Sequence, residues 1–176
     1  MSRRIVIAYW LIPAEPARSF FQAVINELAH QHGAPVFEPH MTVFVGANRV
    51  RAAERVLSQV ARERQSISLK TLGIDQSDEF IKTLFVQFAM NRRLRQINET
   101  IRDAGKDPSR YELKPHLSLL YKTTPAAVRR EMAASISVPY SEVSFDTVRA
   151  VRCVSPTRSR TDVEAWHVMA SAELSG

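Results

Sequence analysis

The chain has 176 residues, of which 45% are apolar and 24% charged, the composition of an ordinary globular domain. Its 24 basic and 18 acidic side chains give a net charge of +6, which attracts anions such as nucleotides and nucleic acid without selecting one. The single cysteine, Cys153, excludes an internal disulfide, and no apolar run reaches the ~18–20 residues of a membrane span.

The chain opens on two arginines and a short apolar run that ends at Pro13. That run is rich in Ile, Val, Tyr and Trp, so it reads as a first β-strand over residues 5–12 rather than as an export signal. We therefore expect a cytoplasmic protein with no membrane partner. The remaining elements of the first half are predicted as a helix over 16–32, a strand over 40–45, a helix over 50–64 and a strand over 66–74.

The second half repeats this order after a polar turn at 75–79. We predict a strand over 80–89, a helix over 91–104, a strand over 116–121, a helix over 125–135 and late strands over 144–154 and 163–171. The most polar connection of this half is the loop 106–111 (Lys-Asp-Pro-Ser-Arg-Tyr).

The two halves match when one is shifted by 76 residues. This shift places 39–43 (Pro-His-Met-Thr-Val) on 115–119 (Pro-His-Leu-Ser-Leu), and the helices fall into register as well. We therefore predict one bilobal domain over residues 1–176, with a first repeat at about 4–74, a second at about 80–154 and a closing strand at 163–171. The expected class is α+β, a pseudo-two-fold duplication whose antiparallel sheets line a central cleft with helices packed outside.

The matched segments carry the pattern His-x-Thr/Ser twice. Side chains alternate faces along a strand, so His40 and Thr42 point to one side, as do His116 and Ser118. A pseudo-two-fold arrangement of the strands would bring two imidazoles and two hydroxyls to one cleft. The alternative reading is a pair of buried histidines whose role is structural.

Two imidazoles and two hydroxyls suit one kind of chemistry. Because the ordinary pKa of histidine lies near 6.5, one ring can act as base while the other acts as acid. Hydroxyls can stabilise the charge on phosphoryl oxygens. The set therefore favours metal-free phosphodiester cleavage, most easily of a strained cyclic phosphate. The sequence contains no metal-ligand cluster, no Gly-x-Ser-x-Gly and no glycine-rich phosphate loop, so we expect neither a metal nor a cofactor.

The two motifs resemble the paired signature of the 2H phosphoesterase superfamily, and most closely its cyclic phosphodiesterase branch, which is related to 2′-5′ RNA ligase-like proteins. Residues 9–13 (Tyr-Trp-Leu-Ile-Pro) and 164–168 (Glu-Ala-Trp-His-Val) also look like the first and last strands of that branch. The resemblance implies the 2H phosphoesterase fold. It also implies hydrolysis of nucleoside 2′,3′-cyclic phosphates and of ADP-ribose 1″,2″-cyclic phosphate.

By the same resemblance, each motif residue takes a role. His116 would be the base and His40 the acid, an assignment only slightly favoured over its reverse, and both hydroxyl residues of the motifs would hold the phosphate. Tyr121 and Trp10 would line the pocket. Strict alternation turns Tyr121 away from His116, so its role requires the strand to end or bulge there. Trp10 has a competing interpretation as a core residue.

Other readings remain open. The enzyme could act on RNA ends that carry a 2′,3′-cyclic phosphate or on 2′–5′ linkages, or the chain could be a nucleotide- or RNA-binding module without turnover. The expected partner is thus a small cyclic phosphate or an RNA end, bound by a monomer. The resemblance places loop 106–111 beside the cleft as a mobile segment. Whether Arg49, Arg51 or Arg110 reaches the phosphate is open.

Overall fold

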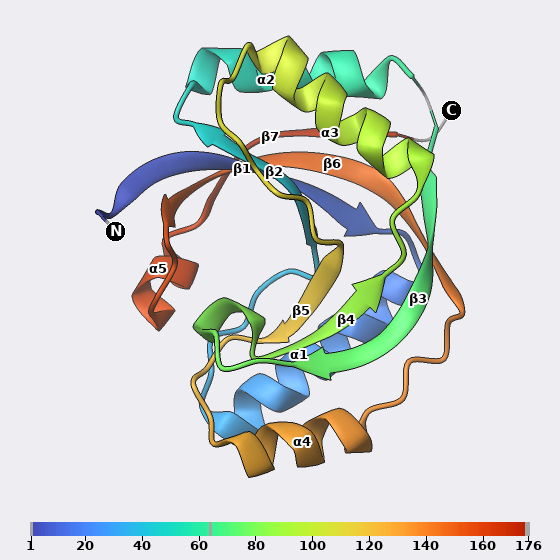
Figure 1. The fold of residues 1–176 in the computed structure, drawn as a ribbon, viewed down its shortest axis with the longest axis vertical. Helices are drawn as coiled ribbons and strands as arrows, with labels where there is room; N and C mark the ends of the chain where they lie inside the picture. The colour runs from blue at the N-terminus through green and yellow to red at the C-terminus, as the bar shows by residue number, and fades with distance from the viewer. Residues whose placement is uncertain (1, 64, 175–176) are drawn as a thin grey trace.

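A computed structural model describes residues 2–63 and 65–174 of the chain, arranged as two lobes that face each other (Figure 1). The strands are β1 (Arg4–Pro13), β2 (Met41–Ala47), β3 (Ile67–Gln76), β4 (Leu84–Phe88), β5 (His116–Leu120), β6 (Glu142–Ser155) and β7 (His167–Glu173). They pair antiparallel in the order β2-β1-β6-β3-β4-β5, and β7 pairs with β6. This is the α+β class expected from the sequence.

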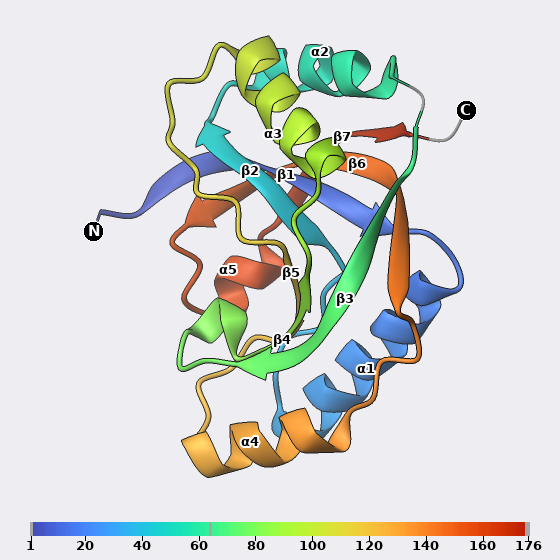
Figure 2. The ribbon, with the colours of Figure 1, turned by 45° about the vertical axis from the view of Figure 1, so that its right-hand side comes forward.

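Helices cover the outer faces of this sheet. They are α1 (Ala17–His32), α2 (Val50–Ala61), α3 (Arg92–Gly105) and α4 (Ala126–Ser135); the short α5 (Arg160–Glu164) follows β6 and lies at the open side of the lobes. In Figures 1 and 2, α2 and α3 lie over the lobe made of β1, β2, β6 and β7, while α1 and α4 lie against β3, β4 and β5. Since the helices cover the outside, the inner faces of the two lobes are left to form a site. None of the helices in the described part of the chain is long and apolar enough to cross a membrane.

The central strand β1 shows why the chain folds this way. All of its residues from Val6 onward are buried, because the strand lies between β2 and β6 and is covered on both faces. Tyr9 and Leu11 belong to the large core, whereas Ala8 and Trp10 form a separate small cluster with Val151. Alternation along one strand thus divides the core side from the side that faces the other lobe.

The strand order reads the same from either end when each strand is exchanged for its counterpart in the other half. At the centre of the sheet, β3 pairs with β6 so that Ser68 lies opposite Ser144, its own counterpart 76 residues later, and the two hydroxyl oxygens are 2.6 Å apart. An approximate two-fold axis therefore passes between these serines. This symmetry supports the division into repeats at about 4–74 and 80–154, whose limits stay a prediction.

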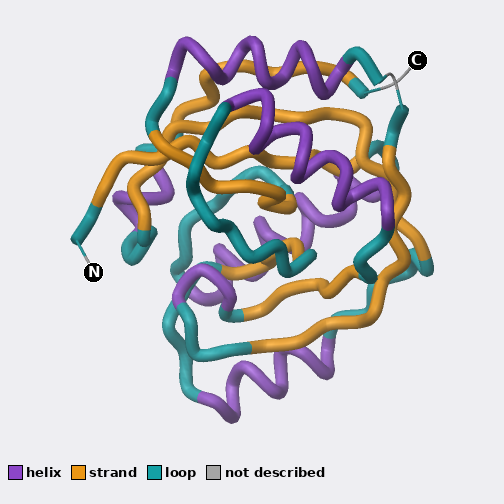
Figure 3. Tube along the Cα trace, turned by 45° about the horizontal axis from the view of Figure 1, so that its top comes forward, coloured by secondary structure: helices purple, strands orange, loops and turns teal. Residues whose placement is uncertain are grey.

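Several predicted ends shift by a residue or more; β2, for example, begins at Met41, so His40 lies just before it. Three elements differ further (Figure 3). The strand expected over 80–89 begins with a turn of 3₁₀ helix, Phe80–Lys82, and the buried Thr83 hydroxyl that follows it donates to the Lys122 carbonyl at 2.7 Å. The helix expected over 50–64 ends at Ala61, and residue 64 lies outside the described residues. The closing strand begins at His167 because residues 160–164 form α5.

The short helix α5 has a local cause in the sequence. The Ser159 hydroxyl accepts a hydrogen bond from the Asp162 amide at 3.2 Å, which caps the helix. Asp162 is itself buried, and its carboxylate accepts from the Arg158 amide at 2.9 Å and from the Arg3 guanidinium. The capping serine and the paired carboxylate therefore stabilise a helix that includes residues 163 and 164, where the apolar pattern predicted the start of a strand.

Candidate active site

A pocket of about 560 Å³ opens between the two lobes. It is lined by β1, β2, the last residues of β6, the start of β5 and the loops around 109–111 and 155–157. Five of the six residues singled out in the sequence line this pocket, and these are Trp10, His40, Thr42, His116 and Tyr121. We refer to it below as the central pocket. The fold therefore brings the two motifs, which are 76 residues apart, to one cavity.

His40 is the residue just before β2, and it lies inside a group of aromatic rings. Trp10 stacks on its imidazole with ring centroids 3.7 Å apart and an angle of 15° between the planes, and Trp166 meets it edge-on at 5.5 Å. The Tyr121 hydroxyl is 3.5 Å from His40 Nε2. His40 is thereby almost completely buried, and it lines the central pocket beside Tyr121.

Both imidazoles are oriented in the same way by the backbone. His40 Nδ1 lies 2.6 Å from the Glu38 carbonyl oxygen, and His116 Nδ1 lies 2.7 Å from the Lys114 carbonyl oxygen. A carbonyl can only accept, so in each neutral ring the proton resides on Nδ1 and Nε2 keeps its lone pair. Each ring therefore presents to the central pocket a nitrogen able to take up a proton.

The two imidazoles differ in burial. Burial lowers the pKa of His40 from 6.5 to about 4, against the opposing effect of the Glu38 carbonyl, and the positive charge of a protonated His116 lowers it further. Burial also lowers the pKa of His116; Lys82 acts in the same direction, whereas Glu79 and the Lys114 carbonyl oppose it. Both rings are consequently neutral near pH 7, and His40 is the harder of the two to protonate.

The two hydroxyls are placed differently. Thr42 is half-buried and lines the central pocket. Ser118 is buried behind the wall of that pocket, and its hydroxyl donates to the Ile81 carbonyl at 2.8 Å. The 3₁₀ turn that carries Ile81 was expected to be strand, so this hydrogen bond could not be foreseen. Thr42 therefore lines the pocket, whereas Ser118 does not and instead bonds to the backbone of Ile81, which does.

Tyr121 faces the central pocket because β5 is irregular. In the β4–β5 pairing, Leu84 lies opposite Leu120 and Phe85 opposite Ser118, so one extra residue is accommodated in β5, which ends at Leu120. The pocket position that the resemblance implies for Tyr121 depends on this irregularity. Burial raises the pKa of its phenol, so the group stays neutral and can donate a hydrogen bond.

The sequence reasoning missed several lining residues. Trp166 packs against Trp10 at 5.1 Å and lines the pocket, although it was cited only as part of the last strand. Arg4 and Arg110 also line it, and Arg110 was left open. Arg49 instead donates to the Lys106 carbonyl at 2.9 Å, so it contacts the backbone of the 106–111 loop. No signal in the sequence distinguishes these arginines from other exposed ones.

Within residues 2–63 and 65–174, no three His, Cys, Asp or Glu side chains converge in a way that would hold a metal ion. Cys153 lines the central pocket as a free thiol, and burial raises its pKa to about 11, which keeps it protonated.

The duplicated sheet, with His40 and His116 lining one pocket, has the 2H phosphoesterase fold. The solved structures it matches include a phosphoesterase, at a TM-score of 0.63 and 10% identity over 98% of this chain and 100% of that one. They also include Escherichia coli LigT complexed with 3′-AMP, at a TM-score of 0.60 and 14% identity over 97% and 98% of the two chains.

Within that class, the chain belongs to the family of cyclic phosphodiesterase-like proteins, which residues 5–174 match. Among curated relatives, it is 22% identical over 173 residues to the cyclic phosphodiesterase of Arabidopsis thaliana, covering 96% of this chain and 95% of that protein. The resemblance seen in the two motifs thus extends over the whole fold.

Proposed function

We propose that this protein hydrolyses nucleoside 2′,3′-cyclic phosphates or ADP-ribose 1″,2″-cyclic phosphate by general acid–base catalysis with His40 and His116. The observation that carries the proposal is the pair of imidazoles lining one pocket, each with Nδ1 bonded to the carbonyl two residues earlier. This geometry leaves two Nε2 atoms to exchange protons with a ligand. The relatives support the substrate class, because the Arabidopsis protein is a cyclic phosphodiesterase.

The reaction needs one neutral and one protonated imidazole. The base takes a proton from water as the water oxygen attacks phosphorus, and the acid gives a proton to the ribose oxygen as its bond to phosphorus breaks, leaving a phosphomonoester. Both rings are neutral in the free protein, but an anionic phosphate in the pocket raises the pKa of the nearer imidazole and so favours its protonation.

Burial bears on which histidine takes which role. His40 is the more strongly buried ring and stays neutral down to lower pH, as the base must before the reaction. His116 lies at the edge of the pocket and exchanges protons with solvent more readily, which suits the acid. This proposal reverses the assignment that the resemblance suggested.

A substrate with a better leaving group separates the two roles. Sulfur in place of the leaving ribose oxygen removes most of the need for a general acid. We expect His116→Ala to recover much of its lost rate on such a cyclic phosphorothiolate, and His40→Ala to recover little. The opposite pattern would restore His116 as the base.

The activity itself is tested on purified protein in EDTA, with a nucleoside 2′,3′-cyclic phosphate and ADP-ribose 1″,2″-cyclic phosphate as substrates. We expect turnover of at least one of them, and the ratio of the two kcat/KM values identifies the preferred substrate. Absence of turnover of both, together with RNA binding, would favour a binding module instead.

A second candidate substrate is an RNA end that carries a 2′,3′-cyclic phosphate. His116 also borders a second groove of about 420 Å³, whose lining includes Lys82, Lys114 and the exposed Leu72. This groove could hold the nucleotides that precede the cyclic end. If it does, a short oligonucleotide ending in a cyclic phosphate will have a higher kcat/KM than the mononucleotide, and the advantage will shrink with added salt.

A further inference from the structure

The two catalytic candidates are held by different means. His116 is the first residue of β5 and pairs with Gln87 of β4, so the sheet itself fixes its backbone. His40 precedes the first paired residue of β2, Met41, and lies at the end of a segment, 33–40, that has no regular helix or strand. The backbone that carries His40 therefore needs another anchor.

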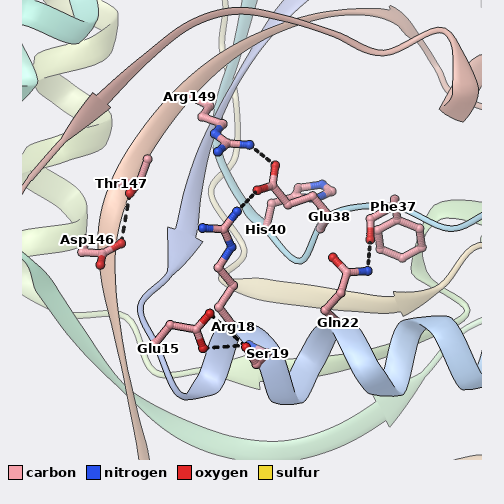
Figure 4. A network of polar contacts seen from close by, with 10 residues as sticks. All are labelled: Glu15, Arg18, Ser19, Gln22, Phe37, Glu38, His40, Asp146, Thr147 and Arg149. Atoms are coloured by element: carbon pink, nitrogen blue, oxygen red, sulfur yellow. Dashed lines mark hydrogen bonds and ion pairs between the residues drawn. The ribbon is translucent and has the colours of Figure 1, made fainter.

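Glu38 supplies a contact of that kind. Its carboxylate lies between two guanidinium groups, that of Arg18 on α1 at 2.9 Å and that of Arg149 on β6 (Figure 4). The Glu38 and Arg149 side chains are only 21% and 22% exposed, so water screens this pair less than it screens a surface pair. We call Glu38 and its two arginine partners the Glu38 clamp. Because Arg18 and Arg149 belong to different lobes, the clamp ties the segment that carries His40 to both lobes.

The residue whose carboxylate forms the clamp also contacts the His40 imidazole through its backbone. The carbonyl of the same Glu38 residue accepts the hydrogen bond from His40 Nδ1 that sets the tautomer of the ring. Arg149 is also the cross-strand neighbour of Trp10, the ring on which His40 stacks. Movement of the clamp would therefore disturb both the hydrogen bond and the stacking that fix His40.

The second motif differs at the position that corresponds to Glu38, where the side chain is exposed and forms no comparable pair of buried contacts. The residue 76 positions after Glu38 is Lys114, whose side chain is 65% exposed and pairs with Glu112, which is 80% exposed. Exposed pairs of this type contribute little to stability. The symmetry of the fold therefore makes the pair a natural control for the clamp.

We propose that Glu38 is a positioning residue for His40, and that the ion pairs with Arg18 and Arg149 hold the Glu38 carbonyl where it keeps His40 Nδ1 protonated and its Nε2 directed into the central pocket. The catalytic part of this inference rests on the proposed function. The orientation of the ring does not, because it can be observed without turnover.

The test uses Glu38→Ala and Glu38→Gln, with Glu112→Ala as the matched control. Positioning errors of about 1 Å cost up to about 100-fold in rate, so we expect Glu38→Ala to lower kcat by about 10–100-fold with little change in KM. Glu38→Gln keeps an oxygen that can accept from one arginine, so its kcat should lie between those of Glu38→Ala and the wild type. Glu112→Ala should match the wild type.

Nitrogen-15 NMR of the histidine rings provides the second readout. In the wild type, His40 should show a single tautomer with the proton on Nδ1, and in Glu38→Ala it should show a mixture of tautomers. Unchanged His40 signals in Glu38→Ala would overturn the proposal, even if stability and rate both fell. If the wild type turns over none of the substrates but the tautomer still changes in Glu38→Ala, the proposed function fails and the positioning role stands.

Discussion

The two histidines have the same chemical identity and matched backbone contacts, yet burial separates them. His40 is enclosed by Trp10 and Trp166, whereas His116 lies at the start of a strand at the edge of the pocket. A buried ring resists the charged form, and this one property sets both how the site titrates and how the fold responds to acid.

The pH dependence of kcat/KM follows from these burial effects. The rate should rise with pH through the pKa of His40, at about 4, because the base must be neutral. It should fall with further increase through the pKa of His116, which is lowered below 6.5, because the acid must be protonated. We therefore expect a bell-shaped profile with its maximum below pH 6.5, whichever ring is the base. A maximum at or above pH 7 would contradict this.

The same shift predicts acid sensitivity of the fold. The pKa of His40 is about 4 when folded and 6.5 when unfolded, so between these values the unfolded chain binds a proton that the folded one does not. The contribution of neutral His40 to the free energy of unfolding is thus fully present above pH 6.5. It is lost as the pH falls toward 4, which lowers that free energy by about 3 kcal/mol. Urea unfolding at several pH values measures it. His40→Ala should flatten the slope; an equally steep slope would exclude His40 as its source.

Sequence alone could identify the motif residues because a repeat makes them visible twice. It could not show that Ser118 bonds to the Ile81 carbonyl, since this depends on a 3₁₀ turn where the apolar pattern suggested strand. Nor could it pair Glu38 with Arg149, which is 111 residues away. Such contacts depend on how elements meet, and periodicity within one element carries no information about them.

At the scale of elements, the loop 106–111 is anchored to the end of β2. The Asp107 carboxylate accepts from the Ala47 amide at 2.7 Å and from the Ser109 amide at 2.8 Å. A Cβ on Gly46 would lie 2.2 Å from the same carboxylate, so only glycine leaves room for this contact. These bonds attach to the end of β2 the loop that the resemblance placed beside the cleft, and its Arg110 lines the pocket.

Loosening this anchor should weaken substrate binding more than chemistry. Asp107→Ala removes two hydrogen bonds to a charged group, and Gly46→Ala displaces the carboxylate, so both should raise KM by about 3–10-fold with a smaller effect on kcat. Asp103→Ala is the control, because Asp103 is 71% exposed and lies outside the central pocket. An unchanged KM in both loop variants would show that the loop does not contribute to binding.

At the scale of the whole molecule, the alternating pattern and the 76-residue shift predicted two matching halves and most of their elements, but not the 3₁₀ turn or α5. The sequence did not indicate that α1 packs on β5 of the other half and α3 on β2, because this depends on long-range packing. The halves also share the β3–β6 pairing at the two-fold axis. This pairing is the central junction of the sheet.

Phe145 tests the junction. It is fully buried, lies opposite Ile67 in the β3–β6 pairing and packs on Phe88 at 5.6 Å. Phe145→Ala should therefore lower the free energy of unfolding by about 3–5 kcal/mol, measured by urea denaturation. Leu72→Ala, at a residue that is 59% exposed, should change it by less than about 0.5 kcal/mol. A comparably small effect at Phe145 would argue against a shared core.

The most direct test of the central claim is kcat/KM for a nucleoside 2′,3′-cyclic phosphate in EDTA, measured for the wild type, His40→Ala, His116→Ala and the double variant. We expect each single variant to lose at least about 100-fold, and the double variant to lose little more, because the two rings act as a unit. His167→Ala, which removes an exposed histidine of β7, should keep the wild-type rate. Near wild-type turnover by either single variant would contradict catalysis by the two histidines.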